Sequence, residues 1–137
     1  MKIKKSDYPE LNLSQNRVPD LIDMAKKDGA VVGTLHEIKS GKMNTRDFKQ
    51  FDDYMEFAGK KGGSPVQVGG KRVVVNEVKY TFTDASALKD PKTQGWLVKK
   101  MKDHNKLKIE VFDAKGIKHD FGQANKSELK TFLEHLS

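Results

Sequence analysis

The chain has 137 residues, of which 36% are hydrophobic and 33% charged, and its formal net charge is +7. This length predicts one domain with a single core of moderate size. The absence of cysteine excludes disulfides and thiolate metal sites, and no apolar run approaches the ~18 residues of a membrane span. The N-terminus lacks the apolar region of a signal peptide. The basic charge favours a polyanionic partner.

The first predicted structural unit is a β-hairpin. Residues 1–16 carry little apolar periodicity and are interpreted as an N-terminal arm, either loose or with one helical turn. Two apolar stretches follow, at about residues 17–25 and 30–39, separated by a segment that ends in Asp28-Gly29. Asp-Gly between apolar runs is a strong hairpin signal. We therefore expect the two strands to pair and to bring Asp20 beside Glu37.

The second strand of this hairpin carries residue types suited to hydrolysis. Side chains alternate along a strand, so Glu37 and Lys39 lie on one face. Two carboxylates can hold a hard divalent cation, and a nearby ammonium can position a water or stabilise developing negative charge. With Asp20 beside them, this combination suits phosphodiester hydrolysis. The alternative is a strand-edge aspartate that bonds to a turn, next to a surface ion pair worth under ~1 kcal/mol.

The rest of the chain alternates helices and strands. The predicted elements are a helix over 45–58, a strand over 73–82, a helix from 90, a hairpin of 107–112 and 117–121, and a helix after 125. Asn44 and Asp47 are spaced like a capping box for the first of these helices. The glycine-rich segment 60–70 is read as a long flexible loop. This order predicts an α/β fold with a mixed central sheet flanked by helices, in one domain over residues 17–137.

Three motifs in this order resemble the PD-(D/E)XK nuclease superfamily, which has the restriction-endonuclease-like fold. Pro19-Asp20 and Glu37-Ile38-Lys39 match the two halves of its signature. Gln50 and Tyr54 resemble the Gln-x-x-x-Tyr element that follows the catalytic strand in RecB-like branches. The resemblance covers residues 17–58. It implies an α/β/α core and a metal-dependent nuclease.

The resemblance also implies a role for each motif residue. Asp20 and Glu37 would ligate Mg²⁺ or Mn²⁺, and the carbonyl of Ile38 would complete the shell. Lys39 would orient or activate the attacking water, and the Gln-x-x-x-Tyr pair would support the metal site or position a phosphate. DNA is the favoured substrate, with tRNA or another RNA as the alternative, because the phosphodiester chemistry is the same.

The N-terminal side departs from this pattern. Many relatives place a glutamate on a helix before the first core strand, and here Glu10 and Asp7 are the acids near that role. Small versions of the fold resemble C-terminal toxin domains of secreted bacterial effectors, including contact-dependent inhibition systems. That resemblance implies delivery within a larger effector, a cytoplasmic site of action and a cognate immunity protein as partner.

Two further patterns compete with or extend this interpretation. Six lysines lie within residues 92–108, and Lys99, Lys100 and Lys102 are the candidate nucleic-acid-binding residues, with a solvated helix face as the alternative. Glu77-Val78-Lys79 is a second Glu-x-Lys, which we interpret as an exposed strand face because neither companion motif accompanies it. The alternative functions are a non-catalytic nucleic-acid-binding module and a phage or mobile-element interaction protein.

Overall fold

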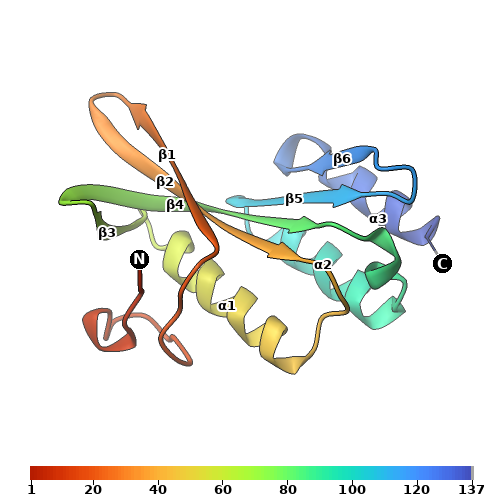
Figure 1. Ribbon diagram of the computed structural model, residues 1–137, viewed down its shortest axis with the longest axis horizontal. Helices are drawn as coiled ribbons and strands as arrows, with labels where there is room; N and C mark the ends of the chain where they lie inside the picture. Colours follow the sequence, from red (N-terminus) through yellow and green to blue (C-terminus); the bar gives the residue numbers. More distant parts are fainter. Residues whose placement is uncertain (137) are drawn as a thin grey trace.

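A computed structural model describes residues 1–136 as one mixed β-sheet with helices packed against it (Figure 1). Its main elements are β1 (Leu21–Lys27), β2 (Ala30–Lys39), α1 (Thr45–Gly59), β3 (Ser64–Val68), β4 (Lys71–Phe82), α2 (Pro91–Asp103), β5 (Leu107–Phe112), β6 (Lys118–Phe121) and α3 (Lys126–Glu134). The strand order is β1-β2-β4-β5-β6, and β3 also pairs with β4. The central strands β2, β4 and β5 are parallel, whereas β1, β3 and β6 run antiparallel to their neighbours. The predicted α/β class is confirmed.

The β1–β2 hairpin forms as its sequence predicts. Asp28 and Gly29 both have positive φ, 51° and 81°, which is the requirement of a type I′ turn. In the resulting register Leu21 pairs with His36, and the residues just beyond this pair are Asp20 and Glu37. The first strand begins at Leu21, later than expected, so Asp20 lies in the bend that precedes it.

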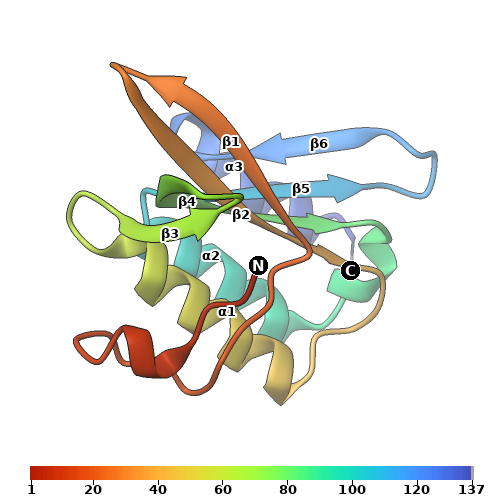
Figure 2. The same ribbon diagram turned by 60° about the vertical axis from the view of Figure 1, so that its left-hand side comes forward.

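All three helices cover the same face of the sheet. Tyr80, Ile109 and Phe121 are register partners across β4, β5 and β6, so their side chains share one face. The ring of Phe51 in α1 packs on Tyr80, and the ring of Phe132 in α3 packs on Phe121. Helix α2 lies between these two helices, and Figure 1 and Figure 2 show α1 and α2 side by side below the strands.

The opposite sheet face explains why the helices form one layer. In the described residues this face carries polar and charged side chains, among them Glu77, Lys79, Glu110 and Lys118. Such a face offers too little continuous apolar surface for a further helix to pack on it. The sheet flanked by helices is therefore present, but the second helical layer of an α/β/α core is not found among residues 1–136.

Two segments are more ordered than the sequence suggested. The expected loop 60–70 contains β3, and Gly69 and Gly70 form its turn into β4 with positive φ values of 56° and 79°. The N-terminal arm has the expected helical turn, at Lys5–Asp7, but it is packed rather than loose. Its Ile3 and Leu13 side chains are only 1% and 3% exposed and belong to the core.

Helix α1 carries the groups that will face the candidate site. The predicted capping box is present, because Asn44 Oδ1 accepts from Asp47 N and Asp47 Oδ2 accepts from Asn44 N. Its inner face buries Phe51, Tyr54 and Met55. Across the described residues, every helix is too short or too polar to cross a membrane.

Candidate active site

Asp20 and Glu37 lie side by side and hold each other through the backbone. The amide of Asp20 donates a hydrogen bond to Glu37 Oε1 at 2.9 Å. The amide of Ile38 in turn donates to Asp20 Oδ2 at 2.9 Å. These reciprocal bonds fix both carboxylates at the point where β2 passes the bend before β1.

Glu37 is the buried member of the pair, with 3% of its surface exposed. Its Oε1 accepts a second hydrogen bond, from the hydroxyl of Tyr54 at 3.0 Å. Burial raises the pKa of the Glu37 carboxyl, and the nearby Asp20 carboxylate raises it further, against the opposing effects of the hydrogen bonds and of Lys39. The ionised carboxylate is therefore held at a cost, which a bound cation would reduce.

Lys39 lies between two carboxylates. Its Nζ is 3.9 Å from Glu37 Oε2 and 3.0 Å from Asp47 Oδ1. Asp47 is thus both the capping residue of α1 and the nearer partner of Lys39. The sequence did not predict this second role, because the capping box already accounts for an acid at this position. The one sequence feature that indicates the contact with Lys39 is that the capping box directly follows the Glu-x-Lys strand.

The Gln50 and Tyr54 side chains, one helical turn apart on α1, both point toward the sheet. Burial and the Glu37 charge raise the pKa of Tyr54 far above its ordinary range, so the hydroxyl stays protonated and acts as a donor. Gln50 Oε1 accepts from the hydroxyl of Tyr80 at 3.4 Å, one strand away from Glu37. Tyr54 therefore touches the carboxylate pair directly, whereas the contact made by Gln50 is with β4. Tyr80 was not anticipated, since a tyrosine in an apolar strand looks like core.

Ile38 contributes through its backbone. Its side chain is 44% exposed and lies on the opposite face from its neighbours Glu37 and Lys39. Its amide holds Asp20, as described above, while the ligand role expected of its carbonyl stays a prediction. Glu10 pairs with Lys60 at 3.2 Å, just after the end of α1, whereas Glu37 of the carboxylate pair contacts that helix at Tyr54.

The donor set suits a hard cation bound mainly by solvent and substrate oxygens. No cluster of three or more His, Asp or Glu side chains suited to a metal occurs within residues 1–136. Asp20 Oδ1 has no hydrogen bond to another described residue, and Glu37 Oε2 has only the 3.9 Å contact with Lys39. One oxygen of each carboxylate is therefore available, and Mg²⁺ commonly binds through one or two carboxylates and keeps several waters. The two carboxylates fit Mg²⁺ or Mn²⁺.

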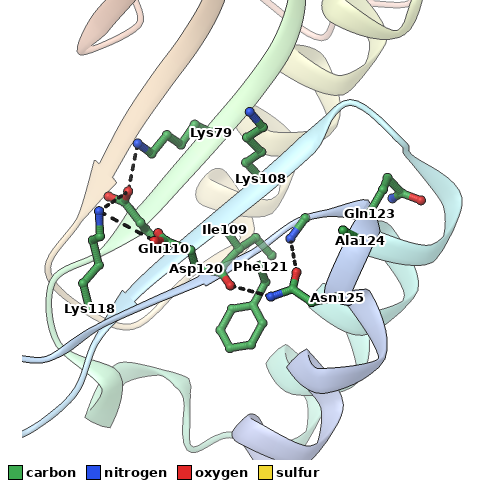
Figure 3. A pocket seen from close by; sticks show the side chains of 11 residues that line it. Lys79, Lys108, Ile109, Glu110, Lys118, Asp120, Phe121, Gln123, Ala124 and Asn125 are labelled. Atoms are coloured by element: carbon green, nitrogen blue, oxygen red, sulfur yellow. Dashed lines mark hydrogen bonds and ion pairs between the residues drawn. The ribbon is translucent and has the colours of Figure 1, made fainter.

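The second Glu-x-Lys makes a different set of contacts (Figure 3). Lys79 Nζ pairs with Glu110 at 2.8 Å, and Lys118 approaches the same carboxylate at 3.6 Å. Glu77 accepts instead from Thr34 at 3.0 Å and pairs with Lys108 at 3.2 Å. The two residues thus belong to cross-strand ion pairs on the uncovered sheet face, where Lys79 lines a depression of about 730 Å³. This arrangement is that of an exposed strand face.

The candidate phosphate-binding lysines lie on the outer surface of α2. Lys99 pairs with Asp103 at 2.7 Å within the helix. Lys100 pairs with Asp52 of α1 at 2.7 Å, and its Nζ lies 5.4 Å from the ring centroid of Trp96. Lys102 is exposed and forms no ion pair with a described residue. Their role in nucleic-acid binding stays a prediction.

Comparison of the chain with protein-family models, with curated proteins and with solved structures gives no match.

Proposed function

We propose that this protein is a metal-dependent nuclease that hydrolyses phosphodiester bonds of nucleic acid. One observation carries the proposal: the backbone amides of Asp20 and Ile38 hold the Glu37 and Asp20 carboxylates side by side, and Lys39 Nζ lies 3.9 Å from Glu37 Oε2. A structural ion pair would not require the burial of a carboxylate beside a second carboxylate, because that arrangement costs free energy. Such costly arrangements of ionisable groups cluster at functional sites.

Each residue of the site has a distinct task in this proposal. Asp20 and Glu37 hold Mg²⁺ or Mn²⁺, which when bound polarises a phosphoryl oxygen and lowers the pKa of a coordinated water. Tyr54 donates to Glu37 Oε1 and so occupies this oxygen, which leaves Oε2 for the cation. The ammonium of Lys39 donates to the attacking water or to the phosphate, where negative charge develops. Asp47 holds that ammonium in place from the cap of α1.

The partner in this proposal is nucleic acid. A net charge of +7 attracts a polyanion without selecting its sequence. DNA is the favoured substrate and tRNA or another RNA the alternative. The biological setting we propose is that of a bacterial toxin domain, with a cytoplasmic site of action and a cognate immunity protein. The competing function is non-catalytic nucleic-acid binding, and it is favoured by the contact that pairs Lys39 with Asp47.

The deciding experiment incubates the protein with plasmid DNA and, separately, with total RNA. Mg²⁺ or Mn²⁺ should support cleavage, Ca²⁺ should bind without comparable turnover, and EDTA should abolish the reaction. Glu37→Gln and Asp20→Asn serve as matched variants, because each keeps the shape and one acceptor oxygen of the side chain it replaces. Cleavage that survives in EDTA, or in both variants, would disprove the metal mechanism.

A further inference from the structure

A groove lies beside the candidate site, between the loop that follows β2 and the segment that leads into α2. It has a volume of about 410 Å³, and it is lined by Lys42, Met43, Ala87, Lys89, Asp90 and Thr93. The amide of Thr83 donates to the carbonyl of Lys39 at 2.9 Å, so the segment after β4 is tied to the end of β2. One wall of the groove therefore follows β2 directly, and the other follows β4 at the point where it is tied to Lys39.

The groove has charged walls and an apolar floor. Lys42 and Lys89 are exposed, and neither forms an ion pair with a described residue. Met43 and Ala87 supply apolar surface and are 9% and 8% exposed. The single acid, Asp90, accepts hydrogen bonds from the amide and the hydroxyl of Thr93 at 3.3 and 3.0 Å. Its hydrogen-bonding capacity is thus used partly at the start of α2. The two ammonium groups form no ion pair with a described residue, although the charge of Lys42 acts at longer range on Asp90 and that of Lys89 on Asp84.

We infer that this groove binds the substrate strand immediately beside the scissile phosphate, an inference that rests on the proposed nuclease function. The ammonium groups of Lys42 and Lys89 bind backbone phosphates, and the floor contacts the sugar or base between them. Free ammonium groups bind phosphate without first breaking an ion pair, which Lys99 and Lys100 of α2 would have to do. Contacts of this kind position a strand and do not read its sequence.

The test is the salt dependence of binding, measured in EDTA so that no cleavage occurs. Fluorescently labelled single-stranded and duplex DNA, and single-stranded RNA, are titrated with the parent protein and with the double variant Lys42→Gln, Lys89→Gln. The matched control is Lys26→Gln, Lys27→Gln, which removes the same charge at the tip of the β1–β2 hairpin, away from the end of β2 (Figure 1). Loss of two phosphate contacts should flatten the slope of log K against log salt by ~1.4 on single strands or ~1.8 on duplex.

We expect the groove variant to bind more weakly and to show the full change in salt slope. The hairpin control should show less than half of that change in slope. All four lysines are exposed, so each variant should keep the melting temperature of the parent. Equal effects of the two double variants, or no binding by the parent, would overturn the inference. If the groove variant shows the expected slope change but the parent never cleaves with Mg²⁺ or Mn²⁺, the proposed function is refuted, and the groove is a nucleic-acid-binding site with no scissile phosphate beside it. If the parent cleaves nucleic acid but the groove variant binds like the parent, the groove assignment is refuted and the proposed function stands.

Discussion

Replacing Glu37 by glutamine should stabilise the protein and abolish its activity at the same time. Burial raises the pKa of Glu37, so the folded protein pays to keep this carboxylate ionised at neutral pH. Glutamine keeps an oxygen that can accept from Asp20 N and from the Tyr54 hydroxyl, as Glu37 Oε1 does at 2.9 and 3.0 Å. It lacks the charge that the proposed metal requires. Stability and function therefore oppose each other at this position.

The size of the gain follows from these contacts. Neutral acceptors weaken the two hydrogen bonds by about 1 kcal/mol each. Against this, the variant removes the cost of keeping a carboxylate away from water, which amounts to several kcal/mol. Because the pKa is raised, the second effect exceeds the first, and we expect a net gain on the order of 1 kcal/mol at pH 7. For a domain of this size, that corresponds to a melting temperature higher by about 3–5 °C.

The pH dependence of this gain identifies its cause. A raised folded-state pKa favours folding below the unfolded value of about 4.3, and this contribution is lost as pH rises through the folded-state pKa. The advantage of Glu37→Gln should therefore be close to zero near pH 4 and full at pH 7, as measured by thermal or urea unfolding across that range. Glu56→Gln makes the same change on the exposed face of α1 and should show no gain. A gain that does not vary with pH, or a loss at pH 7, would refute the reasoning.

Three other predictions follow from the contacts of the lysines. Lys39→Ala should lower the single-turnover cleavage rate by about 10²-fold or more with little loss of affinity, whereas Lys79→Ala should keep a rate within a few-fold of that of the parent. The reverse result would mean that Glu77-Val78-Lys79 is the functional Glu-x-Lys. Asp47→Asn, which keeps the cap but not the charge beside Lys39, should slow cleavage roughly tenfold to hundredfold with a nearly unchanged melting temperature; an unchanged rate would show that Lys39 does not need this partner. Neutralising Lys99, Lys100 and Lys102 together should flatten the salt slope on duplex by ~0.9, because two of them are already ion-paired; a change of ~2.7 would restore all three as phosphate contacts.

The sequence predicted the parts of the site that depend on local pattern. The Asp28-Gly29 turn and the strands around it set the register that places Asp20 beside Glu37, and strand alternation places Lys39 on the same face. The capping box and the spacing of Gln50 and Tyr54 likewise oriented α1. These features need only residues that are neighbours along one element or one turn.

The remaining features depend on contacts between distant segments. Asp47 meets Lys39 because the loop after β2 turns α1 back over the strand. The sequence shows that the capping box follows the Glu-x-Lys strand, but it does not show the direction of this turn. Strand β3 was hidden by its glycines, which serve as turns at both of its ends. The single helical layer follows from ion pairs such as Lys79 with Glu110, whose residues come from different strands. A pattern within one segment carries no information on such pairings.

The packed N-terminal arm belongs to the framework that holds the Asp20–Glu37 carboxylate pair. Arg17 Nε pairs with Asp53 at 2.6 Å in a buried contact, and Arg17 stands close before the Pro19-Asp20 segment. A chain shortened to start at residue 17 would lose the burial of Ile3 and Leu13, about 1.5–3 kcal/mol for each side chain. Domains have a total stability of only about 5–15 kcal/mol. The smallest unit able to hold Asp20 against Glu37 therefore includes the arm. The arm acts indirectly, because the hydrogen bonds to the two carboxylates come from the Asp20 and Ile38 amides and the Tyr54 hydroxyl.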